Sequence, residues 1–441
     1  MMVDVIKKVL FLLWIISVPL CHATVVVNVN KGVMKPISVA LNLFDRHESV
    51  GDDFLRVVKN DLQGTFLFRA VPEDAFMQNL KGVDQRPTFP LWKAINTEYL
   101  LNAEAYVSGD RIFVKFVLYD VVSTLKIGSM SISGDRRDWR KMAHIVANSV
   151  YERITGEKGY FDTKILYVAV QKQSRGHKIH RLAIMDQDGH NHKFLTNGNN
   201  LVLTPRFSPN GREFSFFAYR EKIVNGRRVP ISASVYRYTF SSGRTELVVQ
   251  FKGMTYAPRY SPNGNLLVFS LSHHGSSSIY TLDLITRRIT RLTKGRCIDT
   301  SPCYSPDGKY VVFNSDRGGT QQLYIMDADG SNVRRLSFSH GRYATPVWSP
   351  RGDWIAFTKI DRGFFIGVIR PDGSGERLLS SGYFVEGPTW APNGRVVMFS
   401  HKDYSKKEKI FSVDITGYNK HEIATPNNAI DPEWSTKEGM F

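Results

Sequence analysis

The chain has 441 residues, 42% of them hydrophobic and 22% charged, and these proportions exclude a wholly disordered chain and a collagen-like one. A formal net charge of +17 makes nucleic acid, anionic membrane surfaces and acidic proteins possible partners. Three cysteines are too few for a disulfide-built scaffold, and they lack zinc-finger spacing.

The first 23 residues have the layout of a secretory signal peptide. Two lysines precede the apolar run 9–18, and a small-x-Ala cleavage site follows at residues 21–23. The apolar run is far shorter than the roughly 20 residues that a membrane-spanning helix needs. Lipoprotein processing at Cys21 is the alternative, but Leu20 stands where that reaction expects a small residue. We therefore expect an exported protein whose mature chain begins at Thr24.

Removal of the signal peptide leaves two cysteines, Cys297 and Cys303. An exported pair can form a disulfide, because the compartment permits it. Two small buried residues are the alternative, and sequence spacing alone leaves both interpretations open.

Residues 24–158 are predicted to form a small α+β domain. A β-rich stretch at 25–29 and an alternating stretch at 37–43 predict strands, and residues 99–107, 111–119 and 126–132 predict a meander. Apolar residues at helical spacing predict one helix near residues 54–62, with Asp52 and Asp53 at its start, and a second near residues 139–154. A linker is expected near residues 156–162.

The positive charge lies mainly in the C-terminal two thirds of the chain. Residues 160–441 carry 38 basic and 24 acidic residues, whereas residues 24–159 carry 18 and 16. The basic pairs fall at expected strand ends and loops and form no continuous stripe, which favours solvated faces over a nucleic-acid footprint. We therefore expect no nucleic-acid partner.

A repeated phrase defines the larger domain, residues 159–441. Its form is Pro-x-aromatic-Ser-Pro-Asn/Asp-Gly, with small variations. The leading prolines are Pro205, Pro258, Pro302, Pro346, Pro388 and Pro432, with spacings of 53, 44, 44, 42 and 44 residues. A period in this range indicates a repeat architecture. Four short strands are expected in each unit, with the turn glycine at positive φ, and such units are typical of propeller blades.

The two ends of this domain complement each other. Residues 165–196 supply three strands without the opening phrase, and residues 432–435 supply an opening strand alone. Together they complete a sixth blade and leave no open sheet edge. The sequence thus predicts an α+β N-terminal domain followed by an all-β six-bladed β-propeller closed by a split blade. The longer first spacing is assigned to a polar hairpin at 221–230, either a binding loop or a plain surface insertion.

Signatures of catalysis and of metal binding are missing from the sequence. It contains no Gly-x-Ser-x-Gly, His-Glu-x-x-His, P-loop or dinucleotide fingerprint. Four histidines between residues 177 and 192 straddle an expected strand and its turn, so surface histidines are favoured over a metal site. The Asp-x-Asp-Gly segments at 186–189 and 327–330 lack the distal Glu of a calcium loop and are interpreted as turns. No catalytic residue, cofactor or metal is expected.

The tandem phrase, the six blades, the α+β domain and the signal peptide together resemble the TolB family of the Tol–Pal cell-envelope system. Segments 25–44, 92–120 and 139–159 also resemble that family, so the similarity spans residues 24–441. The main difference from the pattern of that family is the strongly basic propeller. It leaves the charge of the partner surface open.

The resemblance implies a non-enzymatic, monomeric adaptor of the periplasm, associated with the outer membrane only through its partners. One propeller mouth is expected to bind Pal, the peptidoglycan-associated lipoprotein. The N-terminal segment is expected to engage TolA, the inner-membrane energy-transducing protein. The system supports outer-membrane invagination during cell division and envelope integrity.

Two sets of site residues follow. In a propeller, the loops that enter the innermost strands surround one mouth of the channel, and residues just before the leading prolines are the candidates here. The mouth set comprises Thr204, Met254, Tyr256, Ala257, Thr300, Ser301, Thr345, Glu386 and Asp431; Met254, Ala257 and Thr300 also match Pal-contacting positions of the family. The strand set comprises Thr24, Val25, Val26, Val27, Asn28, Val29 and Asn30.

Each set has an alternative. The mouth residues are also suited simply to shape turns, and the strand set is also suited to an ordinary edge strand of the small domain. The alternative function is a periplasmic propeller hydrolase or cyclase that uses acids at the channel mouth. Glu386 and Asp431 are the acids in the mouth set.

Overall fold

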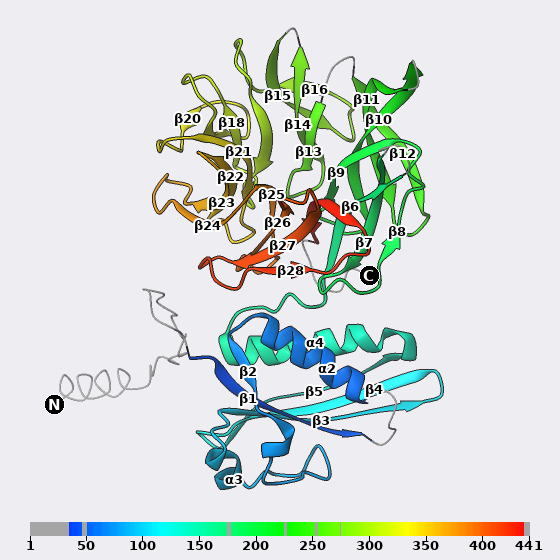
Figure 1. The fold of residues 1–441 in the computed structure, drawn as a ribbon, viewed down its shortest axis with the longest axis vertical. Helices are drawn as coiled ribbons and strands as arrows, with labels where there is room; N and C mark the ends of the chain where they lie inside the picture. The colour runs from blue at the N-terminus through cyan, green and yellow to red at the C-terminus, as the bar shows by residue number, and fades with distance from the viewer. Residues whose placement is uncertain are drawn as a thin grey trace, which may run out of the picture.

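The computed structural model describes residues 35–45, 51–173, 178–224, 227–251, 255–273 and 275–435. The expected signal peptide and the segment 24–30 lie outside this range. An α+β part and a six-bladed propeller make up the described chain (Figure 1). Within these residues, no helix combines the length and the apolar character needed to cross a membrane.

The N-terminal part is built on one five-stranded sheet of order β2-β1-β3-β4-β5. Its elements in chain order are β1 (Ile37–Asp45), α2 (Gly51–Gly64), β2 (Phe68–Ala70), α3 (Phe89–Ala94), β3 (Tyr99–Ser108), β4 (Arg111–Asp120), β5 (Leu125–Asp135) and α4 (Trp139–Thr155), with single 3-10 turns at Glu73–Ala75 and Arg136–Asp138. The predicted meander is confirmed as β3–β4–β5, and both predicted helices are present. The sequence did not predict β2 and α3, because three and six residues are too short to show a period.

The sheet lies between two helical layers. Helices α2 and α4 cover the face nearest the propeller, and α3 covers the other face (Figure 1). Helix α2 has two aspartates in its first turn, which favour its N-terminus, and it buries Phe54 and Val58. Helix α4 ends at Thr155, and the following Gly156 caps it: its N–H donates to the Glu152 carbonyl at 2.9 Å, and its φ of 73° lets the chain leave the helix.

Five blades of the propeller are formed by consecutive strands, each an antiparallel four-stranded sheet with the proline-containing strand at one edge. The first two comprise β9 (Leu201–Phe207), β10 (Glu213–Val224), β11 (Arg227–Thr239) and β12 (Arg244–Phe251), then β13 (Thr255–Tyr260), β14 (Leu266–His273), β15 (Ser276–Asp283) and β16 (Ile289–Arg291). The third comprises β17 (Thr300–Tyr304), β18 (Tyr310–Ser315), β19 (Gln322–Asp327) and β20 (Arg334–Arg335). The last two comprise β21 (Arg342–Trp348), β22 (Ile355–Ile360), β23 (Phe364–Ile369) and β24 (Arg377–Gly382), then β25 (Phe384–Trp390), β26 (Val396–Lys402), β27 (Glu408–Asp414) and β28 (His421–Ile423).

The sixth blade joins the two ends of the propeller and confirms the predicted split-blade closure. Its order is β29 (Asn428–Trp434), β6 (Lys164–Lys172), β7 (Lys178–Asp186) and β8 (Lys193–Phe194). The turn glycines of the repeat are at positive φ as predicted, from 68° at Gly211 to 79° at Gly352. The predicted insertion is the outer part of the long β10–β11 hairpin.

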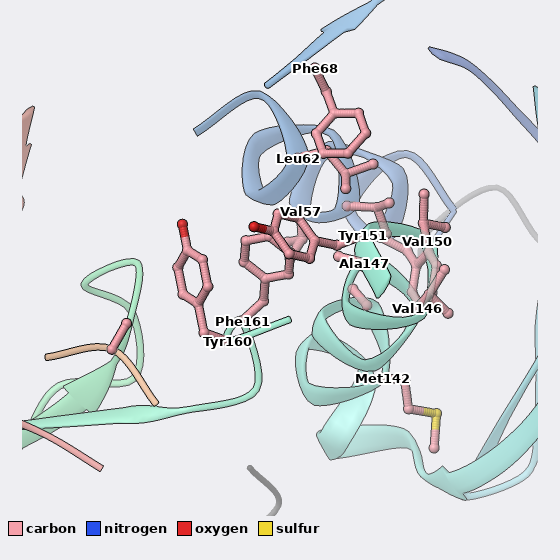
Figure 2. Close-up of a cluster of buried hydrophobic side chains, with 14 of the residues drawn as sticks. Val57, Leu62, Phe68, Met142, Val146, Ala147, Val150, Tyr151, Tyr160 and Phe161 are labelled. Atoms are coloured by element: carbon pink, nitrogen blue, oxygen red, sulfur yellow. The ribbon is translucent and has the colours of Figure 1, made fainter. Parts of the chain in front are cut away.

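The linker between the two parts is held by aromatic side chains. Tyr160 and Phe161 lie against α2 and α4 (Figure 2), and both pack edge-on against Tyr151. On its other side Tyr160 packs against Trp434 of β29, at 5.6 Å between ring centroids. One hydrophobic cluster therefore runs from the N-terminal helices through the linker into the split blade.

Candidate functional site

The mouth of the propeller is formed by the same backbone distortion in every blade. In each innermost strand, the residue before the leading proline and the proline itself together oppose one residue of the next strand, which is a β-bulge. Five of these pre-proline residues have a described φ in the left-handed region: Thr204 45°, Ser301 54°, Thr345 46°, Gly387 64° and Asp431 51°. The bulge bends the start of each innermost strand.

The repeat explains why the bulges form. Proline has no N–H, so the ladder loses no donor at that position. A buried aromatic ring opposes each bulge, which fixes its place in the blade: Phe216, Phe269, Phe313, Phe357, Phe399 and Tyr167. A non-glycine residue in the left-handed region costs roughly 1–3 kcal/mol and persists only where its surroundings impose it. Packing of the blades therefore maintains the same mouth geometry around the ring.

The bulges surround a cavity of about 190 Å³ at the mouth. Of the predicted mouth set, Thr204, Ser301, Thr345, Glu386 and Asp431 line this cavity, and all five are half-buried. Thr300 precedes Ser301 in β17 and is half-buried as well. Tyr256 and Ala257 lie in β13 at the equivalent place of their blade, and Met254 is outside the described residues.

Polar contacts tie neighbouring blades together at the mouth. The N–H of Thr204 donates to Asp431 Oδ2 at 3.2 Å, and the N–H of Asp431 donates to Ser400 Oγ at 2.9 Å. Within one blade, Asn314 Nδ2 of β18 donates to Thr300 Oγ1 of β17 at 2.8 Å. The mouth is thus a fixed ring of small polar side chains and exposed backbone.

Glu386 has an unusual acidity. Burial raises its pKa to about 7, and the negative charge of Asp431 adds to the rise. The protonated form of this side chain is therefore favoured relative to an ordinary glutamate, which lowers the negative charge at the mouth.

Below the mouth, the side chain that follows the leading proline of each repeated phrase, the x position, lines the channel. The six residues are Arg206, Arg259, Cys303, Val347, Thr389 and Glu433, and all of them line a second cavity of about 290 Å³. Glu433 lies between two arginines, 3.5 Å from Arg206 Nη1 and 3.5 Å from Arg259 Nη1. We did not single out these residues from the sequence, although their common position in the repeat was a usable indication.

Cys303 and Cys297 are both free thiols, Cys303 buried and Cys297 half-buried. The structure thus supports the unbridged interpretation. Cys303 Sγ instead accepts from the Trp348 N–H at 3.5 Å.

A second polar cluster lies between the N-terminal helices and the propeller. His144 Nδ1 of α4 is 2.6 Å from Asp61 Oδ2 of α2, and both side chains are almost fully buried. Gln187, in the turn after β7, donates to Asp61 Oδ1 at 3.0 Å. In the same turn, Asp188 forms an ion pair with Arg140. These contacts connect the two parts of the molecule.

This cluster has the residue types of a metal site. The donor atoms of Asp61, His144 and Asp188 lie within 4.8 Å of one another. Both carboxylates are already engaged, Asp61 by His144 and Gln187 and Asp188 by the Arg140 guanidinium. We therefore assign the cluster to an interdomain ion-pair network.

One predicted plain turn has a larger role than we assigned to it. The Asp-x-Asp-Gly segments 186–189 and 327–330 have the same internal bonds, with an Asn side chain donating at 2.6 Å to the first Asp of each. Turn chemistry accounts for both. In addition, residues 186–188 contact Lys164, Asp61 and Arg140, so this turn also joins the propeller to α2 and α4.

Comparisons with known proteins agree with this architecture. A family model described as "TolB beta propeller domain" matches residues 151–438, and one described as "TolB amino-terminal domain" matches residues 25–127. Tol-Pal system protein TolB of Rickettsia felis is 44% identical over 433 residues, covering 94% of this chain and 95% of that protein. The protein of the same name from Rickettsia canadensis is also 44% identical, covering 94% and 96%. The crystal structure of TolB from Acinetobacter baumannii has the same fold, with a TM-score of 0.80 at 24% identity, covering 92% of this chain and 98% of that one.

Proposed function

The chain belongs to the TolB family of Tol–Pal system proteins, and from this premise we propose that it is a non-enzymatic adaptor in the periplasm. Its propeller mouth binds the peptidoglycan-associated lipoprotein Pal. Its segment 24–30 binds the inner-membrane protein TolA. By engaging both partners it supports outer-membrane invagination during cell division and envelope integrity.

The observation that carries the proposal is the ring of bulges around the mouth. It offers backbone and small side chains, chiefly Thr, Ser and Gly, held in one geometry by six blades. The cavity of about 190 Å³ is smaller than the roughly 300–1,000 Å³ typical of small-molecule sites. A rigid, shallow, partly polar ring suits the surface of a folded protein better than an enclosed small substrate.

Substitutions in the ring test the first partner. Thr300→Arg and Ala257→Arg are expected to weaken Pal binding by at least about tenfold, roughly 1.4 kcal/mol, because bulk at the mouth obstructs a docked protein. Isothermal titration calorimetry with purified Pal measures the change. Thr290→Arg is the matched control, since Thr290 is exposed on the outermost strand β16 of the Ala257 blade. Unchanged affinity in both ring variants, with the melting temperature preserved, would remove the mouth from the Pal interface.

Replacing the segment 24–30 tests the second partner. Its run of valines favours an extended strand, which can be added to a partner by backbone pairing. Seven Gly and Ser residues in its place are expected to abolish TolA binding and to leave the Pal affinity within about tenfold. The alternative is an edge strand of the five-stranded sheet, whose outer strands are β2 and β5. Full TolA binding together with a lower melting temperature would favour that structural role.

The acids at the mouth support the alternative of a hydrolase or cyclase. Glu386, with its pKa raised to about 7 beside Asp431, has the acidity of a general acid or base. Glu386→Gln separates the two functions, since an enzyme loses turnover and an adaptor keeps a Pal-binding surface of the same shape. Turnover of envelope glycans or peptides that is lost in this variant would favour the enzyme.

A further inference from the structure

A second, inner chamber lies deeper in the channel than the mouth. It has a volume of about 290 Å³ and is lined by the six x-position residues, by the aromatic side chains that follow them and by the turn prolines. Its charged lining residues are Arg206, Arg259 and Glu433. Nothing in the Pal and TolA proposals involves this chamber, so its role can be argued separately.

The charges of the inner chamber do not balance. Two guanidinium groups face one carboxylate among the residues that line it, so this lining carries one excess positive charge. The negative charge of Asp431 at the mouth also acts on Arg206. The two arginine–glutamate distances are both 3.5 Å, longer than the 2.7–2.9 Å of strong charge-assisted hydrogen bonds. Glu433 also accepts from Thr389 Oγ1 at 3.3 Å. One carboxylate therefore neutralises one arginine, and neither pair is tight.

The excess positive charge affects Arg206 more than Arg259. Its side chain is buried, and burial together with the charge of Arg259 lowers its pKa to about 10. One of its nitrogens, Nη1, donates to the Pro205 carbonyl at 2.7 Å. Its Nε is buried and has no hydrogen-bond partner among the described residues. A buried charged donor without an acceptor is costly, and an anion would supply the acceptor.

The acids of the mouth lie on the other side of the two arginines. Glu386 and Asp431 line the mouth cavity and not the inner chamber. Arg206, Arg259 and Val347 line both cavities, so the two guanidiniums form the floor between them. An anion in the inner chamber is therefore separated from both acids by the arginines.

We propose that the inner chamber binds one small free oxyanion, of the phosphate or sulfate class, at the guanidinium groups of Arg206 and Arg259 that Glu433 leaves unsatisfied. The oxygens of such an anion accept from the guanidiniums, including the unpartnered Nε of Arg206, and its charge offsets the excess. The occupied chamber would then strengthen the link between the first, second and split blades, which supply Arg206, Arg259 and Glu433.

Paired variants of opposite sign test this proposal. Inorganic phosphate is titrated into the mature protein at constant ionic strength and pH 7, with calorimetry and the melting temperature as readouts. The wild type is expected to bind one phosphate saturably. Arg259→Gln leaves Arg206 paired with Glu433, and we expect it to weaken phosphate binding at least about tenfold. Glu433→Gln leaves two unpaired arginines and is expected to tighten binding by about tenfold.

Lys309→Gln is the control, because it removes one positive charge from an exposed turn of the propeller. Phosphate also stabilises proteins by exclusion from their surface, and that effect is the same in every variant. Equal phosphate response in the wild type and Arg259→Gln, or no saturable binding at all, would overturn the proposal. Absence of free-phosphate binding with tight binding of an acidic protein segment would also overturn it, since the acceptor would then be a partner's carboxylate. If Glu433→Gln fails to fold, the Arg259→Gln comparison still decides.

Discussion

Truncation of the chain after Asp431 is expected to lower the melting temperature by at least roughly 10 °C and to cause aggregation. The truncation removes the end of β29, including Trp434, which is buried and donates to Thr163 Oγ1 at 2.8 Å. Loss of a buried Trp side chain alone costs about 3–5 kcal/mol. The truncation also removes Glu433, leaving Arg206 and Arg259 without their carboxylate, and it removes the partners of Ile165 and Leu166 at the start of β6.

A chain that ends after Ser435 is the matched control. It keeps all of β29 and the bonds by which Ser435 closes the ring, from its N–H to the Lys164 carbonyl at 2.9 Å and from the Lys164 N–H to Ser435 Oγ at 3.0 Å. It is expected to melt like the full-length mature protein in differential scanning calorimetry. Should the chain truncated after Asp431 melt at the same temperature too, β29 would not be the closing strand in solution.

Asp61→Ala is expected to produce the second large effect, a loss of about 3–5 kcal/mol in the free energy of unfolding. The substitution leaves His144 buried beside α2 without its carboxylate and leaves the Gln187 amide without an acceptor. Removing one member of a buried ion pair is costly because the remaining group stays desolvated. Chemical denaturation of the mature protein measures the loss, and a second transition would indicate that the two parts no longer unfold together.

Replacing both members of the pair tests whether the pair stabilises the fold through its charges or only through its packing. Asp61→Leu combined with His144→Leu is expected to recover most of the loss, because neither charge is then buried. Arg56→Ala, which removes an exposed ion pair on the same helix, is the control and is expected to change stability by less than about 1 kcal/mol. Equal losses in the single and double variants would mean that the pair contributes through shape alone.

The same pair predicts a pH dependence with a definite sign. Burial raises the pKa of Asp61 to about 6, above its ordinary 3.8, so the folded state gains stability as the pH falls through 6. For His144, burial lowers the pKa, but the charge and hydrogen bond of Asp61 outweigh it and the net shift is upward. The stability that His144 contributes is therefore complete below about pH 6.5, and it is lost as the pH rises through the raised pKa of His144.

Both shifts have the same sign, so the pair between α2 and α4 contributes less stability in mild alkali than at pH 6. Arg140, Asp186 and Asp188 surround the pair from α4 and the turn after β7, and Asp162 on the linker has a raised pKa with the same sign. The melting temperature of the wild type is expected to fall between pH 6 and pH 9, and that of the double leucine variant to fall less. Parallel pH profiles for the two proteins would contradict this assignment.

The two ends of the propeller thus have different chemistry. The mouth has the bulges and Glu386 with its raised pKa, whereas the turns at the other end border the linker. Asn393 of one such turn donates to the Lys158 carbonyl at 3.2 Å, and Arg351 of another lies 3.4 Å from Glu157. The inner chamber lies toward this second end, because the turn prolines Pro350 and Pro392 are among the residues that line it.

The architecture was largely determined by the sequence alone, because a repeat needs no long-range information to be recognised. Similar phrases, most of them 42–44 residues apart, impose similar blades, and two complementary fragments close the ring as a sixth blade. The meander and the two long helices followed from periods that are local to each segment. By the same logic β2 and α3 were missed, since a three-residue strand and a six-residue helix have no period.

Tertiary structure alone decided which side chains meet. Asp61, His144 and Asp188 come from segments more than 40 residues apart, and only the packing of α2 and α4 on the propeller brings them together. Arg206, Arg259 and Glu433 share a repeat position, but their contact across the channel depends on ring closure by β29. The state of Cys297 and Cys303 was likewise open until the blade was folded. Local periodicity specifies strands and blades, whereas charge pairing depends on distances that exist only after the ring has closed.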